Sequence, residues 1–229
     1  MNPSPFYSGS AWVLPAVLAI TLHEAAHGWM AERFGDGTAR SRGRVTFNPL
    51  KHISLRGTVL IPGILLMLHS PVLFGYAKPV PVDFRRLKPQ RLGMAMVALA
   101  GPGMNILLAL ASALLLHLSP APASGHIGWW ALNFFHALII NCVLALFNMM
   151  PILPLDGGRV ARAMLPGKIG RIYARTERYG LLLVFALLLV PPLLLGANFV
   201  AETLGPLAER LITALLNATG NGEYLSVDL

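Results

Sequence analysis

The sequence predicts an all-α polytopic membrane protein with five to six transmembrane helices. Of its 229 residues, 55% are hydrophobic and only 12% are charged, a balance outside the range of soluble domains. Six apolar stretches approach the length of about 20 residues that one crossing needs. Arginine and lysine residues gather in blocks beside these stretches, as residues that set membrane orientation do, so the net charge of +8 does not indicate a nucleic-acid partner. We expect one integral-membrane domain over residues 1–229, with a core of about 11–165 and C-terminal helices over 178–217.

The apolar stretches differ in how clearly each predicts a crossing. The last one contains Glu202, Glu209 and Arg210, so the sequence leaves open whether it spans the bilayer or lies on its surface. The six stretches run over Ala11–Met30, Val59–Tyr76, Leu92–Leu118, Trp129–Leu155, Leu181–Gly196 and Phe199–Leu216.

The basic blocks predict the orientation of the chain. They follow the first, second and fourth stretches, whereas Ser119–Gly128 contains no lysine or arginine. The positive-inside rule therefore places the three blocks in the cytoplasm and the Ser119–Gly128 loop outside. This arrangement requires the second stretch to enter and leave on one side. Its prolines and glycines, and the segment Tyr76–Val82, favour a re-entrant extended element over Val59–Val82, with an ordinary kinked crossing as the alternative.

The first stretch carries a pattern that is typical of zinc proteases, His23-Glu24-Ala25-Ala26-His27. Histidines at positions i and i+4 of a helix project from one face and can hold one Zn²⁺, with the intervening glutamate beside the water. Ionisable residues inside an apolar run cost several kcal/mol unless they face a partner or a cavity. We therefore expect His23 and His27 to bind a metal and Glu24 to act as general base.

A catalytic zinc takes three protein ligands and one open position, so a third ligand is required. Because Arg33 follows His27 within about two turns, the two histidines should lie in the cytoplasmic half of the first helix. Asp156 ends the fourth stretch just before the basic Arg159, at the same predicted depth. We predict that Asp156 is the third ligand. The alternative is a helix-ending turn in which Asp156 bonds local backbone.

Other candidates for the third ligand fit less well. Asp36 and Asp83 lie in charged loops, where we expect solvated carboxylates. His136 and Glu202 fall in or near the outer half of the membrane, away from the predicted depth of the histidines.

Two motifs, His23–His27 and Asn148–Gly157, match the patterns HExxH and N-x-x-P-x-x-P-L-D-G in that order. With them the chain resembles the site-2 protease family of intramembrane zinc metalloproteases, in its short bacterial form without an inserted PDZ or appended CBS domain. The likeness covers most of residues 11–165. It extends to three further segments, Asn48–His52, Gly75–Val82 and Ala100–Asn105.

The resemblance implies that His23, His27 and Asp156 ligate one Zn²⁺ per chain, that Glu24 activates the water and that Asn148 stabilises the oxyanion. A helix cap is the alternative for Asn148. The first, third and fourth stretches would form a three-helix catalytic core beside the re-entrant element. The chain would sit in the bacterial cytoplasmic (inner) membrane, with its active site toward the cytoplasm.

By the same resemblance, the substrate is a transmembrane segment of another membrane protein, cleaved within the lipid bilayer. An edge near Arg44–Phe47 or Lys78–Val82 would receive the unwound substrate strand. The roles of His52 and Asn105 stay open, although we expect Asn105 to bond backbone freed by a helix break at Gly101–Gly103. Neither the individual substrate nor the oligomeric state is indicated.

A second class of function also accounts for the metal pattern. A zinc-binding membrane protein without proteolytic activity, such as a transporter or a chaperone-like relative, would use the same ligands. Such a protein needs no general base, so the presence of Glu24 favours the protease.

Overall fold

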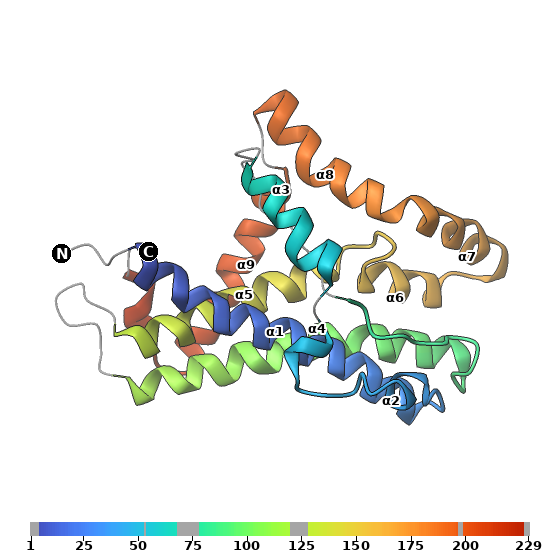
Figure 1. Cartoon of the computed structure of the whole chain (residues 1–229), viewed down its shortest axis with the longest axis horizontal. Coiled ribbons are helices and arrows are strands. Elements are labelled where there is room, and N and C mark those ends of the chain that lie inside the picture. The colour runs from blue at the N-terminus through green and yellow to red at the C-terminus, as the bar shows by residue number, and fades with distance from the viewer. Residues whose placement is uncertain (1–4, 53, 68–77, 120–127, 197–198, 227–229) are drawn as a thin grey trace.

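The computed structural model describes residues 5–52, 54–67, 78–119, 128–196 and 199–226 (Figure 1). Across these ranges every regular element is helical and none is a strand, which confirms the predicted all-α class. Three of the described helical segments are long and apolar enough to cross a membrane, namely Gln90–Leu118, Trp129–Asn148 and Gly167–Leu194. The fold is that of an all-α membrane protein, and the larger number of five or six crossings stays a prediction.

Three helices form the body of the molecule. The helices α1 (Pro5–Arg33), α4 (Gln90–Leu115) and α5 (Trp129–Asn148) pack against one another side by side (Figure 1). Small buried residues on α4, such as Ala109 and Ala113, let the backbones approach closely, as in other membrane bundles. The expected core of first, third and fourth stretches is therefore present.

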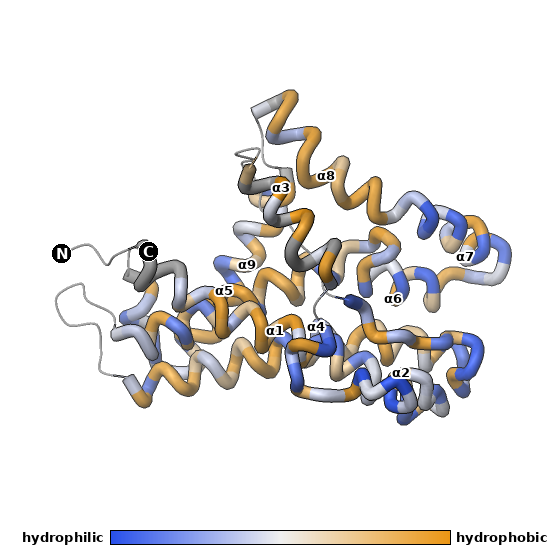
Figure 2. Tube along the Cα trace, viewed as in Figure 1, coloured by the Kyte–Doolittle hydropathy of each residue, from blue (hydrophilic) through white to orange (hydrophobic). Residues whose placement is uncertain are grey.

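Hydrophilic residues gather at one end of this bundle (Figure 2), which we call the basic end. It contains α2 (Thr38–Ser41), α6 (Asp156–Met164), α7 (Gly167–Ala174) and the start of α4. The start of α1 lies at the opposite end, toward which α4 runs. Basic residues at the basic end are Arg40, Arg42, Arg91, Arg159, Arg162, Lys168 and Arg171.

The turn after α5 folds tightly back on itself. The helix ends at Asn148, well before the end of the apolar stretch at Leu155, because Pro151 and Pro154 follow. A Cβ atom at Gly157 would lie only 2.1 Å from the backbone oxygen of Met149. Glycine is thus required for the turn to pack against the start of α6, and this packing places Asp156.

The second apolar stretch begins as helix and is described only in part. A π-helical turn, η2 (Leu55–Leu60), leads into α3 (Ile61–Met67), after a 3-10 turn, η1 (Pro49–Lys51). Residues 68–77 of the predicted re-entrant element lie outside the described residues. Lys78–Val82 is non-helical and runs beside α1 near Glu24. The choice between a re-entrant element and a kinked crossing stays a prediction.

The C-terminal part adds two long helices. The helix α8 (Gly180–Leu195) exposes large apolar side chains such as Leu182 and Leu194, as a lipid-facing helix does. The helix α9 (Phe199–Ala218) packs against α5, and Leu216 and Tyr224 join the core there. The basic segment Arg171–Arg178 between α6 and α8 is helical. The remaining 3-10 turns are η3 (Leu116–Leu118), η5 (Arg175–Tyr179) and η6 (Gly222–Ser226).

Candidate metal centre

Three buried side chains from different elements meet between the core helices. His23 and His27 lie one turn apart on α1, and Asp156 is the first residue of α6. The Oδ2 atom of Asp156 is 3.2 Å from Nε2 of His23 and 3.3 Å from Nε2 of His27. All three side chains are nearly inaccessible to solvent. The structure thus brings together the residues that the sequence proposed as metal ligands, although 129 positions separate His27 from Asp156 along the chain (156 − 27).

A chain of amide groups determines which nitrogen of His23 carries a proton. Asn141 donates its Nδ2–H to the backbone oxygen of Ala137, at 2.8 Å, and its Oδ1 accepts from Nδ2 of Asn105, at 2.7 Å. The Oδ1 atom of Asn105 is then left to accept from Nδ1 of His23. Since an amide oxygen only accepts, Nδ1 is the protonated nitrogen, and Nε2 of a neutral His23 carries a lone pair.

A backbone carbonyl group holds His27 in the same tautomer. Its Nδ1 lies 2.7 Å from the backbone oxygen of Val97 on α4, which can only accept a hydrogen bond. The Nε2 atom of neutral His27 therefore also carries a lone pair. Histidines that bind metals commonly donate their second N–H in this way, which orients the ring and raises the basicity of the ligating nitrogen.

These three groups fit a divalent cation. The Nε2 atoms of His23 and His27 are 3.0 Å apart, and with both Nδ1 atoms protonated neither Nε2 has a hydrogen to share. The Asp156 Oδ2 atom facing them is buried and has no hydrogen-bond donor among the described residues. Three acceptors in mutual contact repel one another unless a cation lies between them. Two imidazoles and one carboxylate form a donor set that suits zinc and leaves a fourth position open.

Gly101 on α4 makes room for the imidazole rings. A Cβ atom at this position would lie 2.4 Å from Nε2 of His27 and 2.6 Å from Cε1 of His23. No heavy atom tolerates such a distance, so any side chain here would displace the rings. The glycine is therefore a condition for the cluster to form.

The carboxylate of Glu24 lies on the same helix between the histidines and is half-buried. Its Oε2 atom accepts a hydrogen bond of 2.7 Å from the backbone N–H of Val80. Arg44 holds this segment in place, because its Nη2 lies 2.6 Å from the backbone oxygen of Lys78. Pro79 and Pro81 have no N–H, and the backbone N–H of Lys78 donates to the backbone oxygen of His52, at 2.8 Å. The segment Lys78–Val82, which we predicted as an edge for the substrate strand, therefore offers that strand fewer free N–H donors than a regular sheet edge would.

Asn148, the expected oxyanion donor, closes α5. Its Nδ2 atom lies 3.0 Å from the backbone oxygen of Leu144, one turn earlier in the same helix. This contact uses one of the two amide hydrogens and leaves the other without a partner among the described residues.

The competing acidic and histidine candidates lie in other environments. Asp36 is fully buried, contrary to the expected solvated carboxylate, and it accepts hydrogen bonds from the Thr38 hydroxyl and from the backbone N–H groups of Thr38 and Asp83. Burial raises the pKa of Asp36, but these hydrogen bonds outweigh it and lower the pKa below its usual value. His136 stacks on Trp12, with ring centroids 3.8 Å apart. Neither Asp36 nor His136 belongs to the cluster of His23, His27 and Asp156.

Part of this centre was not predicted from the sequence. We expected Asn105 to bond backbone released by a break in the third stretch, but α4 continues through Pro102 without interruption and Asn105 bonds His23 and Asn141. The roles of Asn141, Gly101 and the Val97 carbonyl were not foreseen. A signal for Asn141 was available, because an amide inside an apolar run points toward a polar partner.

Comparisons with known proteins agree with this chemistry. The family model for peptidase family M50 matches residues 120–191, which include Asn148 and Asp156. The chain is 37% identical over 185 residues to "Putative zinc metalloprotease YwhC" of Bacillus subtilis (strain 168), an alignment that covers 79% of this chain and 80% of that protein. No solved structure matches the chain.

More distant relatives carry a related name. The chain is 30% identical over 180 residues to "Putative zinc metalloprotease Rip2" of Mycolicibacterium smegmatis, and 29% identical over 177 residues to the protein of that name in Mycobacterium tuberculosis (strain H37Rv). In both cases the alignment covers 77% of this chain and 66% of the relative. The chain belongs to peptidase family M50, the site-2 protease family, and is a zinc metalloprotease of the membrane.

Proposed function

We propose that this protein is an intramembrane protease that hydrolyses peptide bonds in or near transmembrane segments of other membrane proteins. His23, His27 and Asp156 hold the zinc ion, and Glu24 is the general base. The observation that carries the proposal is the meeting of two imidazole Nε2 atoms with a buried carboxylate oxygen that has no hydrogen-bond donor within the described part of the chain, beside a glutamate. A zinc transport site would leave Glu24 without a task.

The depth of the centre supports cleavage within the membrane. Gly101, which touches both histidines, lies eleven residues after Gln90, the first residue of α4 (101 − 90). At 1.5 Å per residue the centre is about 16 Å from the basic end of this spanning helix. A peptide bond can reach it there only from a segment that enters the bilayer.

Each side chain has a distinct task in the reaction. Zinc held by the three ligands would lower the pKa of a water toward about 7 and polarise the substrate carbonyl. Glu24 accepts the proton of the attacking water at Oε1, because Oε2 is engaged by the Val80 N–H. The water oxygen bonds the carbonyl carbon, and Glu24 returns the proton to the amide nitrogen as the C–N bond breaks.

The negative charge that develops on the carbonyl oxygen needs a donor. Asn148 supplies it through the amide hydrogen that does not bond Leu144. The substrate helix must unwind locally first, because a helix engages the carbonyl groups that are to be attacked.

We infer that the protein lies in a bacterial inner membrane with its basic end toward the cytoplasm. The metal centre then opens toward the cytoplasmic side. The support is the charge asymmetry of the bundle. Arginine and lysine residues gather around α2, α6, α7 and the start of α4 (Figure 2), whereas residues 115–119, 128–133 and 215–226, at the end where α5 begins, contain no arginine or lysine.

The decisive experiment compares two isosteric substitutions that remove different functions. Glu24→Gln keeps the volume of the side chain but cannot accept a proton, so the purified variant should hold stoichiometric zinc and cleave no transmembrane peptide. Asp156→Asn replaces an anionic ligand by a neutral one, so zinc should be lost on dialysis against a mild chelator.

The matched control is Glu32→Gln, since Glu32 lies on the same helix but is paired with Arg40 on the surface. This variant should retain both zinc and cleavage. Cleavage by Glu24→Gln at the parent rate would refute the base, and firm zinc binding by Asp156→Asn would refute the third ligand.

A further inference from the structure

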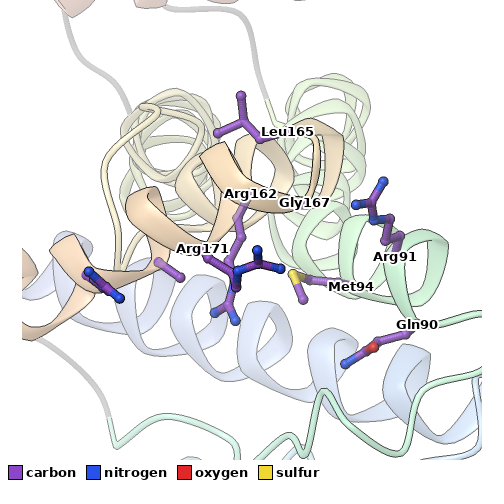
Figure 3. A pocket seen from close by; sticks show the side chains of 10 residues that line it. Gln90, Arg91, Met94, Arg162, Leu165, Gly167 and Arg171 are labelled. Atoms are coloured by element: carbon purple, nitrogen blue, oxygen red, sulfur yellow. The ribbon is translucent and has the colours of Figure 1, made fainter.

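A pocket of about 450 Å³ lies at the basic end, apart from the metal centre (Figure 3). Its walls are α4 on one side and α6, α7 and η5 on the other. The side chains of Arg162 and Arg171 extend toward Met94, with Gln90 and Arg91 on the facing helix. Arg91, Arg162, Arg171 and Arg175 all line the pocket, and none of its lining residues is acidic.

These arginines are poorly neutralised by the protein itself. Among the described residues, no side-chain hydrogen-bond or ion-pair partner reaches Arg91, Arg171 or Arg175. Arg162 has one long contact, 3.5 Å to Glu177, and both of these side chains are partly exposed. A guanidinium group is charged at any physiological pH, so the pocket carries four positive charges. The one negative charge near them in the described part of the chain is that of Glu177, at 3.5 Å from Arg162. Such a cluster is stabilised by a bound anion.

The backbone at the pocket favours the same ligand. Gln90 and Arg91 are the first two residues of α4, and Gly167 is the first residue of α7. Helix N-termini present free N–H groups and a partial positive charge. Neither helix has an acidic residue in its first turn to offset it. Two helix N-termini therefore add to the charge of the four arginines.

The residues around the pocket indicate which kind of molecule carries the anionic group. On α7, Lys168 and Arg171 alternate with Ile169 and Ile172, which are 55% and 65% exposed, and the neighbouring Met164 is 78% exposed. A helix with basic and apolar residues in this pattern lies in the headgroup layer. The same segment continues directly into α8, and Gly167–Leu194 is apolar enough to span the membrane. The pocket is thus expected at headgroup level.

We propose that this pocket is a binding site for a phosphate group at the membrane surface, carried by an anionic phospholipid. The phosphodiester receives guanidinium N–H groups from Arg162 and Arg171, a pairing in which arginine offers two parallel donors, and Arg91 and Arg175 on the walls of the pocket add positive charge. The lipid bridges the start of α4 to α6 and α7. It thereby holds the basic end of the bundle in the headgroup layer, next to the element that carries Asp156.

The test titrates short-chain phosphatidylglycerol onto the detergent-purified full chain and measures bound lipid by native mass spectrometry. Arg91→Gln/Arg171→Gln should bind it roughly 30-fold more weakly than the parent, since each basic residue near an anionic headgroup contributes about 1 kcal/mol. The matched control is Arg42→Gln/Arg85→Gln, which removes two exposed arginines outside the pocket and should leave binding unchanged. Arg91→Lys/Arg171→Lys should recover much of the affinity and guards against misfolding.

Other outcomes overturn the proposal. Equal affinity in the pocket variant and the parent, or equal loss in the pocket and control variants, rules out a site here. Phosphatidylcholine binding as tightly as phosphatidylglycerol contradicts an anionic ligand. If inorganic phosphate displaces phosphatidylglycerol at a concentration similar to that of the lipid, the ligand is a soluble phosphate and the proposed lipid site is wrong.

Discussion

The Nδ1 atom of His23 donates a hydrogen bond to Oδ1 of Asn105, which joins α1 to α4 inside the bundle. Asn105 is itself oriented by Asn141 on α5, at 2.7 Å. The three core helices are therefore connected through one polar chain that ends at an imidazole of the metal centre. The backbone oxygen of Ala137 can only accept a hydrogen bond, so the orientation of each amide in the chain is determined in turn. The Oδ1 atom of Asn105 therefore faces His23, and Nδ1 of His23 must carry the proton.

Asn105→Leu should lower zinc affinity about 10–100-fold, because it removes the group that orients the His23 ring. The measurement is metal content after equilibration with a competing chelator. Asn133→Leu is the control, since Asn133 is a buried amide of α5 that donates to the backbone oxygen of Trp129, away from the metal centre. Equal zinc affinity in both variants would show that the Asn105 contact has no influence on the metal.

Gly101→Ala should abolish zinc binding and cleavage, because the added Cβ would lie 2.4 Å from Nε2 of His27. If the imidazole of His27 rotates to avoid this contact, its Nε2 atom moves away from the metal position between His23 and Asp156. Gly103→Ala is a matched control in the same helix, since a Cβ there meets nothing within 4 Å. Metal analysis and a peptide cleavage assay on both variants check the prediction, and parent-like zinc content in Gly101→Ala contradicts it.

Asn148→Ala should lower kcat by about 10²–10³-fold while zinc content stays at the parent level. The amide that we assign to the oxyanion is lost, whereas no metal ligand changes. Single-turnover cleavage of a transmembrane peptide, with metal analysis of the same sample, makes the measurement. Loss of metal would point to a structural role for Asn148, and unchanged turnover would exclude it as the donor.

Single cysteines should report the orientation of the bundle. In a Cys142→Ala background, Ser119→Cys should react with a membrane-impermeant thiol reagent added to intact cells, and Thr176→Cys should not. The positive-inside rule places Thr176, near Arg171, Arg175 and Arg178, in the cytoplasm. Labelling after cell lysis serves as the control for accessibility. Equal labelling of both positions in intact cells contradicts the topology.

The re-entrant element has a separate test in the same background. If Val59–Val82 enters and leaves on one side, Arg85→Cys should be protected in intact cells, as Thr176→Cys is. Labelling of Arg85→Cys from outside would indicate an ordinary crossing.

The sequence alone predicted the fold class and the grouping of Asp156 with His23 and His27, which the structure brings together. Length and apolar content determine whether a segment is a membrane helix, and the helical period places residues four apart on one face. Asp156 was accessible to the same reasoning because basic residues report depth, so two segments of equal depth can be matched without knowing their contacts.

Only the tertiary structure decided how these groups are held. The contacts that orient His23, His27 and Glu24 join residues 82, 70 and 56 positions apart. Periodicity shows which face of a helix is polar, but not which neighbouring helix that face meets or at which level. The bond from Asn105 to His23, the space left by Gly101 and the contact of Val80 with Glu24 depend on the relative rotation and height of separate segments. Packing of the whole bundle determines both.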